Sequence, residues 1–340
     1  MQTARTKASV RGGRSVGRNH IERMKEKALQ RRPVAFDEAL GLFDSGMKQP
    51  FHLMAAASEI REHFKGKEIS LCGIVNAKSG RCPENCKFCA QSAHYSSGAP
   101  VYPLVSTAEM VENARRAVEN GVRFFGIVTS GKSISAKKEW DTIREAVKLI
   151  DGLGVKVCAS LGTIDRKKAA ELKDAGLFRY HHNLETARSF FSNICTTHDY
   201  EEDVDAVRAA KEAGLSVCCG GLIGLGENIA HRVELAITLR ELDVDSVPVN
   251  ILNPIPGTPL ADVPALSPLE ILVTVAAYRF LLPEKDIKLC GGKEKNLRQL
   301  LPLGIVAGCN SWMTGNYLTT LGRDVYQDLE MIRDLGLKVG

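Results

Sequence analysis

Short runs of β-forming residues alternate with amphipathic helical segments from about residue 67 onward. Eight strands that alternate with helices over about 250 residues predict an α/β fold, the parallel (β/α)8 barrel of the TIM type. Because periodicity alone does not close a barrel, a doubly wound open sheet is the alternative. The strand candidates are residues 68–76, 123–129, 155–161, 178–183, 216–223, 246–252, 286–291 and 304–310.

The chain before the first strand divides into two parts. Residues 1–32 contain ten Lys and Arg residues, with only Glu22 and Glu26 as acids, which gives a charge of +8. Since the whole chain carries +5, residues 33–340 carry −3 and have no basic bias towards nucleic acid. We expect residues 1–32 to form a solvated, disordered tail. Residues 33–66 should form N-terminal helices, and residues 67–340 the barrel.

The distribution of apolar residues excludes a membrane protein. The longest stretches without a polar side chain, 217–226 and 300–309, fall short of the roughly 18 residues that a membrane span needs. No apolar signal segment is present, so we expect a cytoplasmic location, or an organelle if the basic tail is a presequence. Ten cysteines then indicate a reducing compartment, where thiols serve as metal ligands, nucleophiles or core residues.

Cys82, Cys86 and Cys89 form the most specific motif, a C-x3-C-x2-C spacing in the loop after the first predicted strand. Three thiolates within eight residues can hold three irons of a cubane cluster and leave the fourth iron open to a cofactor. A structural zinc site requires four closed ligands, usually from two C-x2-C pairs, and no second pair follows. The motif therefore predicts a [4Fe–4S] cluster at the C-terminal face of the barrel.

This spacing, with Phe88 beside the last cysteine and the barrel pattern, resembles the radical S-adenosylmethionine (SAM) superfamily. The resemblance implies that the open iron binds the amino and carboxylate groups of SAM. Electron transfer would then cleave SAM to methionine and a 5′-deoxyadenosyl radical that abstracts hydrogen. The protein's share of this chemistry is to position the cofactor and to exclude water.

Longer stretches narrow the resemblance to the biotin synthase family. They are NAKSGRCPENCKFCAQS from Asn76, YHHNLET from Tyr180, CGGLIGLGE from Cys219 and VPVNILNPIPGTPL from Val247. The similarity covers about residues 35–338. It implies a sulfurtransferase that inserts sulfur at C6 and C9 of dethiobiotin, with an auxiliary iron–sulfur cluster as the sulfur donor. It also implies a flavodoxin or ferredoxin-type electron donor and a homodimer, without a nucleic-acid or membrane partner.

The resemblance also assigns residues at the ends of the predicted strands. Asn183 and Glu185 would hold the ribose of SAM, and Asn183 would also reach dethiobiotin. Asn250 would bind the ureido ring of the substrate, and Gly224 would let the adenine approach the backbone. Polar residues that end barrel strands face the catalytic mouth, which agrees with these positions. No residue is assigned as an acid or base.

The auxiliary site departs from the family pattern, which is a [2Fe–2S] cluster held by three cysteines and an arginine. Cys158 and Cys218 stand at two of the cysteine positions, but we place Phe125 at the third and Lys288 at the arginine position. Cys290 follows Lys288 by two residues and should share its inward direction, because strand side chains alternate. We expect Cys158, Cys218 and Cys290 to hold the cluster, either [2Fe–2S] or a four-iron variant, with a fourth ligand unnamed.

The other cysteines and two histidines receive simpler interpretations. Cys72 is expected in the core, Cys195 is expected to be structural, and Cys309 would end the eighth strand near the mouth. Cys219 cannot face the interior together with its neighbour on a regular strand, and the roles of these four cysteines stay open. His181 and His182 are interpreted as hydrogen-bonded structural groups.

Two other functions compete with sulfur insertion. Another radical SAM enzyme of the same barrel group, such as a methylornithine synthase type, would share the first cluster loop. Cysteines that face inward on separate strands instead favour a second metal site. A non-catalytic iron–sulfur protein would leave the open three-cysteine site and the polar strand ends without a purpose.

Overall fold

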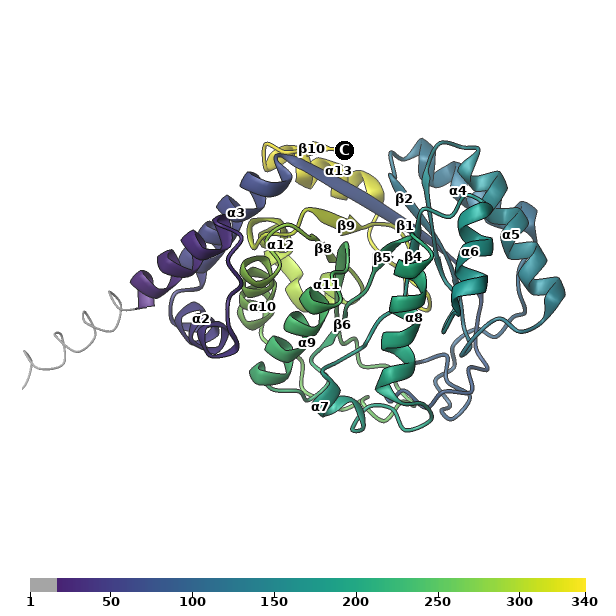
Figure 1. Cartoon of the computed structure of the whole chain (residues 1–340), viewed down its shortest axis with the longest axis horizontal. Coiled ribbons are helices and arrows are strands. Elements are labelled where there is room, and N and C mark those ends of the chain that lie inside the picture. Colours follow the sequence, from purple (N-terminus) through teal and green to yellow (C-terminus); the bar gives the residue numbers. More distant parts are fainter. Residues whose placement is uncertain (1–16) are drawn as a thin grey trace, which may run out of the picture.

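The computed structural model describes residues 17–340, and in this part of the chain parallel strands close into a barrel (Figure 1). The strands pair in chain order, and β1 also pairs with β9, which closes the sheet and confirms the predicted fold class. The barrel strands are β1 (Glu68–Lys78), β2 (Phe124–Thr129), β3 (Lys156–Ser160), β4 (Arg179–His181), β5 (Ser216–Cys218), β6 (Gly221–Ile223), β7 (Ser246–Ile251), β8 (Asp286–Leu289) and β9 (Ser311–Met313).

The fifth predicted strand is divided into β5 and β6, which both pair with β7. At the break, a side chain on Gly220 would collide with the carbonyl of Pro248, so the chain passes close to β7 there. A short strand β10 (Lys338–Val339) pairs with the start of β1. The register with β7 is the same on both sides of the break, because Cys218 pairs with Ser246 and Gly221 pairs with Val249.

Helices surround the barrel because each buries one apolar stripe against the sheet. In α5 (Lys137–Asp151), for example, Trp140, Ile143, Val147 and Ile150 are buried at a spacing of three to four residues. The other outer helices that alternate with the strands are α4 (Thr107–Glu119), α6 (Arg166–Asp174), α8 (Tyr200–Glu212), α9 (Ile229–Glu241) and α10 (Pro268–Leu281). The short helical segments are α7 (Arg188–Phe191), α11 (Lys293–Leu297), η1 (Arg298–Leu300) and α12 (Leu303–Val306), and α13 (Val325–Asp334) follows the last barrel strand.

The basic N-terminal segment is not a tail up to residue 32, because residues 17–29 are helical. Ile21, Met24 and Ala28 lie on one face of this helix and are fully buried. The lysines lie elsewhere on the helix, and Lys25 pairs with Glu59 at 2.8 Å. The charge count hid this apolar stripe, and the rest of the expected tail, residues 1–16, lies outside the described residues.

Two helices follow this segment, α2 (Phe36–Lys48) and α3 (Pro50–Lys65), and both pack against α10 (Figure 1). They cover the outside of the barrel on the side away from α4 and α5. Within the described residues, no helix is long and apolar enough to cross a membrane.

The eighth strand was predicted wrongly at residues 304–310. This stretch contains α12, which Gly308 ends at a φ of +106°, and β9 begins only at Ser311. A short apolar run cannot be distinguished from a buried helical segment by periodicity alone. Cys309 therefore precedes its strand and lies at the N-terminal end of the barrel, not near the mouth.

Candidate active site

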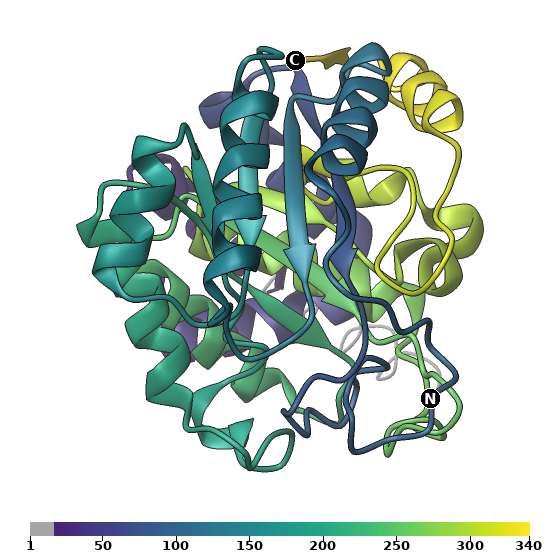
Figure 2. The same ribbon diagram turned by 90° about the vertical axis from the view of Figure 1, so that its right-hand side faces the viewer.

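The loop between β1 and α4 carries Cys82, Cys86 and Cys89, which are all half-buried. In Figure 2 the arrowhead of β2 points towards the end of the molecule where this loop lies. The three cysteines line one cavity of about 200 Å³. Burial raises the pKa of the Cys82 and Cys89 thiols, that of Cys89 to about 11. Metal binding by these thiols would therefore release protons.

Hydrogen bonds fix the shape of this loop from within. The backbone N–H of Cys82 donates to the carbonyl of Gln91 at 3.0 Å, and the N–H of Cys89 donates to the carbonyl of Cys86 at 2.9 Å. The side-chain oxygen of Gln91 accepts from Ser79 Oγ at 3.0 Å and from the N–H of Gly80 at 3.2 Å. The loop thus presents its cysteines in a conformation that the surrounding backbone already stabilises.

A second segment, residues 194–198 after α7, clamps the loop from outside. The N–H of Lys87 donates to the carbonyl of Ile194 at 3.0 Å. The side chain of Asn85 donates to Thr196 Oγ1 at 2.7 Å and accepts from the N–H of Thr196 at 2.9 Å. We call residues 194–198 the clamp; the sequence offered no motif for it beyond the adjacent Thr and His residues.

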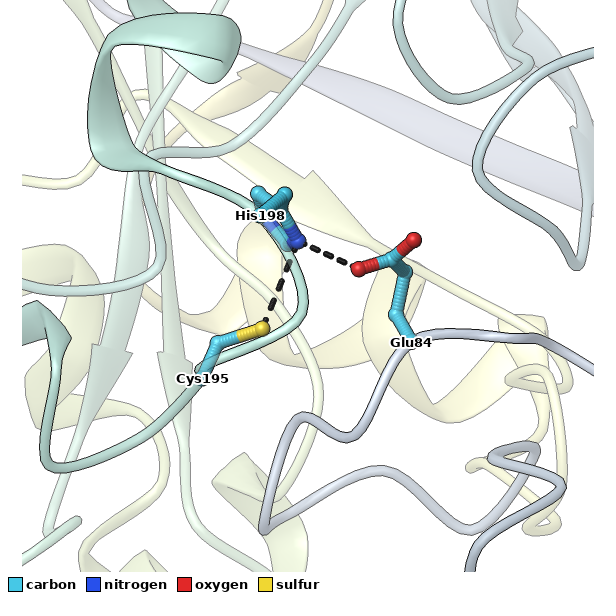
Figure 3. Close-up of side chains that lie close together, drawn as sticks. All are labelled: Glu84, Cys195 and His198. Carbon is cyan, nitrogen blue, oxygen red and sulfur yellow. Dashed lines mark hydrogen bonds and ion pairs between the residues drawn. The ribbon is translucent and has the colours of Figure 1, made fainter.

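Glu84, Cys195 and His198 meet where the clamp joins the loop (Figure 3). His198 Nδ1 lies 2.5 Å from Glu84 Oε2 and 3.3 Å from Cys195 Sγ. Hydrogen bonds to Asp203 and Cys195 raise the pKa of His198 to about 11, so the ring is cationic and its Nδ1 is a donor. One side-chain atom from each residue could bind a metal, and these three atoms lie within 4.8 Å of one another. Because the cationic ring already pairs with its neighbours, we interpret Glu84, Cys195 and His198 as a hydrogen-bonded group, which we call the joint.

The joint reaches the cluster loop through sulfur, because Cys195 Sγ lies 3.8 Å from Cys86 Sγ. On its other side, Asp203 accepts from His198 Nε2 at 3.3 Å and pairs with His182 Nε2 at 2.8 Å. His182 is thus hydrogen-bonded, as its structural interpretation expects, whereas Cys195 lies closer to the cluster loop than the sequence indicated.

Asn183 and Glu185 lie at the end of β4, on the wall shared by the cluster-loop cavity and a larger cavity of about 350 Å³ inside the barrel. Asn183 Nδ2 donates to Glu185 Oε2 at 3.3 Å, and Asn183 Oδ1 accepts from the N–H of Gly220 at 3.2 Å. Burial raises the pKa of Glu185 to about 8, and the charge of Asp203 adds to this effect. A φ of +60° at Glu185 turns the chain so that both side chains face the cavities.

Asn250 near the end of β7 also lines the larger cavity, and its Oδ1 accepts from the N–H of Gly291 at 3.1 Å. Gly224, in contrast, lines neither of these two cavities. It forms a turn at a φ of +90°, and its N–H donates to Glu227 at 2.9 Å. Glu227 is paired in turn with the buried Arg232 at 2.7 Å.

The inner end of the larger cavity is lined by thiols. Cys158 on β3, Cys218 on β5 and Cys290 after β8 all line it, as does Cys72 on β1. Lys288 is 4% exposed, and its Nζ donates to Cys72 Sγ at 3.1 Å and to Cys218 Sγ at 3.8 Å. The structure therefore brings together the three expected auxiliary cysteines and Lys288, and it adds Cys72, which was expected to be a core residue.

The expectation for the second strand was displaced by one residue. Phe125 packs in the apolar core outside the barrel interior, and Gly126 lines the cavity and pairs in register with Cys158. A slip of one position reverses the face of every strand residue, and both faces of this buried strand are apolar, so the sequence could not reveal the error. The residue of β2 that faces the cavity is therefore Gly126 and not Phe125, and in either case this strand contributes no sulfur.

Charge at the inner end of the cavity favours the thiolate form of Cys218 but not those of Cys158 and Cys290. Burial opposes ionisation of Cys218, but the ammonium of Lys288 and the neighbouring His181 outweigh it and lower the pKa of Cys218 to about 6. Burial raises the pKa of Cys158 to about 12. Arg179, whose Nε donates to Ser216 Oγ at 2.9 Å, is a second cation beside these thiols.

The two remaining cysteines lie outside the cavities. Cys219 is buried in the core between the sheet and the helices, and Cys309 lies near Arg61 and Arg279. The sequence contained the signal for Cys72, since residues 72 and 74 alternate along the first strand and both line the cavity. Without a register to say which face is inward, that signal could not be used.

Comparisons with known proteins agree with this arrangement. Residues 77–239 match the Radical SAM superfamily, and residues 248–338 match the Biotin and Thiamin Synthesis associated domain. A crystal structure of methylornithine synthase superposes with a TM-score of 0.79 at 19% identity, covering 93% of this chain and 97% of that chain. The FeFe-hydrogenase maturase HydG from Carboxydothermus hydrogenoformans gives 0.77 at 19% identity, covering 98% and 82%. These two likenesses establish the fold.

Curated relatives give a closer relation. The biotin synthase of Geobacter metallireducens is 53% identical over 94% of this chain and 98% of its own length. The biotin synthases of Geotalea uraniireducens and Geobacter sulfurreducens are also 53% identical, over 94% of this chain and 97% and 98% of their own lengths. At this identity and coverage, the chain belongs to the biotin synthase family of radical SAM enzymes.

Proposed function

We propose that this chain converts dethiobiotin to biotin by inserting sulfur at C6 and C9. One observation carries the proposal: a single cavity runs from Cys89 of the cluster loop, past Asn183 and Asn250, to the thiols at its inner end. A substrate in this cavity would lie between a site for radical generation and a site that can hold sulfur. The family relation supports the same reaction.

The cluster loop fits a [4Fe–4S] cluster, because it offers three half-buried sulfurs on one cavity and no fourth cysteine within the loop. When bound there by Cys82, Cys86 and Cys89, the cluster supplies the electron that cleaves SAM. The clamp and Gln91 would keep the three sulfurs in place during this chemistry. Enclosure by the barrel and loops would exclude water from the reacting groups.

Asn183, Glu185 and Asn250 would position the reactants. The carboxyl group of Glu185 can form hydrogen bonds with two ribose hydroxyls, which suits SAM in the space that both cavities share. Asn183 faces the same space and offers an amide to SAM or to dethiobiotin. Asn250 offers an amide to the ureido ring, whose N–H and C=O groups need complementary partners. Gly224 would act indirectly, by shaping the turn beside Leu252.

Cys158, Cys218 and Cys290 would hold the auxiliary iron–sulfur cluster that donates the sulfur. Their sulfurs line one cavity together with two buried cations, which offset the negative charge of bound thiolates. Replacement of Cys290 by serine should change the iron content and the spectrum of this cluster. Unchanged iron content and spectrum would remove Cys290 from the ligand set. A flavodoxin or ferredoxin-type donor, a homodimer and a cytoplasmic location complete the proposal.

The function is tested by anaerobic turnover of the reconstituted protein with SAM, dethiobiotin and a reductant. Mass spectrometry should detect biotin and about two equivalents of 5′-deoxyadenosine, one for each C–S bond. An Asn250→Ala variant should raise the KM for dethiobiotin and still cleave SAM. If 5′-deoxyadenosine forms without biotin while both clusters are intact, the substrate assignment is wrong. A methylornithine synthase-like reaction would give that result.

A further inference from the structure

We propose that Cys72 is the fourth protein ligand of the auxiliary cluster, which would then be held by the sulfurs of Cys72, Cys158, Cys218 and Cys290. The inference rests on the proposed sulfur-inserting function, and it names the ligand that the sequence left open. It also makes Lys288 a charge partner of the cluster and not a ligand.

The position of Cys72 is the first argument. Its side chain lines the same cavity as the other three thiols and packs with Cys158 and Phe124 in a small cluster inside the barrel. The Lys288 ammonium group donates hydrogen bonds to both Cys72 and Cys218, so these two sulfurs lie on the same nitrogen atom and close to each other. Cys72 is thus linked by contacts to thiols on two other strands.

Gly126 is the second argument. It stands on β2 between β1 and β3 and pairs in register with Ile74 and Cys158. A side chain there would have its Cβ 3.1 Å from Ile74 Cγ2 and 3.9 Å from Cys158 Cβ, so glycine makes room for the Ile74 side chain and presents no side chain of its own to the cavity. The resemblance implies a cysteine ligand on this strand, and the residue of the strand that lines the cavity beside Cys158 is Gly126, which has no sulfur. The neighbouring strand β1 can supply the missing sulfur from Cys72.

Lys288 is the third argument. A buried ammonium group is costly unless it is paired, and within the described residues its hydrogen-bond partners are two sulfurs. Neutral thiols are weak partners for such a cation, whereas thiolates bound to iron carry the charge that it needs. Protonated, Lys288 has no lone pair with which to bind iron.

A core role for Cys72 explains these contacts less well. Cys219 shows the alternative, because it is fully buried among apolar side chains between the sheet and the helices. Cys309 lies at the opposite end of the barrel from the cluster loop. Cys72 differs from both because it lines a cavity and accepts a hydrogen bond from an ammonium group.

The test compares Cys72→Ala and Cys72→Ser with Cys309→Ser in the reconstituted full-length protein. We would measure iron and sulfide per chain, the Mössbauer spectrum, and the rate at which a chelator removes auxiliary iron. The Cys72 variants should lose auxiliary iron about 10–100-fold faster, since even a lost outer partner costs a metal site that much affinity. The spectrum of the loop cluster, and its response to SAM, should not change.

The controls separate this proposal from the function on which it rests. Cys309→Ser should match the unmodified protein, and the serine variant of Cys72 carries the test if the alanine variant does not fold. The inference is wrong if the folded Cys72 variant keeps the iron content, the spectrum and the chelation rate of the auxiliary cluster. That result would not contradict the proposed function. Mutation of Cys82, Cys86 and Cys89 removes the iron of the loop cluster. If the unmodified protein contains no iron in addition to that amount, it has no auxiliary cluster, and the proposed sulfur source is wrong.

Discussion

At Glu185, a carboxyl group is enclosed by protein where the functional proposal needs a hydrogen-bond acceptor. Burial raises its pKa from 4.5 to about 8, so the folded protein holds this proton more tightly than the unfolded chain does. The stability that the proton confers is complete below about pH 4.5 and is lost as the pH rises through 8. A buried carboxyl group at this position therefore lowers the stability of the folded protein at alkaline pH, where the group must ionise.

Glu185→Gln should therefore stabilise the SAM-free protein at alkaline pH. The expected gain in the free energy of unfolding is at least about 1.4 kcal/mol at pH 9, the value of one pKa unit, and it should vanish near pH 4.5. Anaerobic urea denaturation followed by circular dichroism measures it. The same variant should bind SAM more weakly. A gain that does not depend on pH would show that the carboxyl is not desolvated.

Lys288→Met tests the role of the buried ammonium group. If Lys288 is a charge partner, the variant should keep the iron content of the auxiliary cluster and lower its reduction potential, because a positive charge beside the cluster is lost. Spectroelectrochemistry measures the potential, and iron analysis measures the content. Loss of iron from the auxiliary cluster of the variant would instead indicate that Lys288 is a ligand.

Among the elements, the clamp is hydrogen-bonded to the cluster loop through Ile194 and Thr196. His198→Ala removes the ring that contacts Glu84 and Asp203 across the joint. We expect the loop cluster to be lost to a chelator about tenfold faster, as for other outer-shell partners. His63→Ala on the exposed face of α3 is the matched control. Equal rates in the two variants would show that the loop holds its shape without the joint.

Helices and strands were predicted correctly from the sequence where a single pattern determines the type of element. The first seven strands and the outer helices follow from apolar periodicity. In the structure, Ser106 and Asp165 cap two of these helices by accepting hydrogen bonds from backbone N–H groups at the helix N-termini. The prediction failed where two signals conflict. The stretch 304–310 is apolar enough for a strand but forms a buried helix, and the basic composition of residues 17–29 hides an apolar stripe.

For the whole molecule, closure of the barrel decides which residues share the interior. Parallel strands that close through β1 and β9 bring their carboxyl ends to one mouth, so Asn183 and Asn250 line the same cavity although 66 residues separate them. The cluster loop and the polar strand ends could be predicted from motifs. Cys72 and Gly126 could not, because their direction depends on strand tilt and register, which no local pattern records.

Isotope labelling of the auxiliary cluster tests the central claim, that the sulfur of the product comes from the thiol-lined end of the cavity. The protein would be reconstituted with sulfur-34 sulfide, freed of excess sulfide, and allowed a single turnover with SAM and dethiobiotin. The account predicts biotin that carries sulfur-34, and no biotin from a Cys158→Ala variant that still cleaves SAM. Unlabelled biotin from a protein whose auxiliary cluster is fully labelled would contradict it.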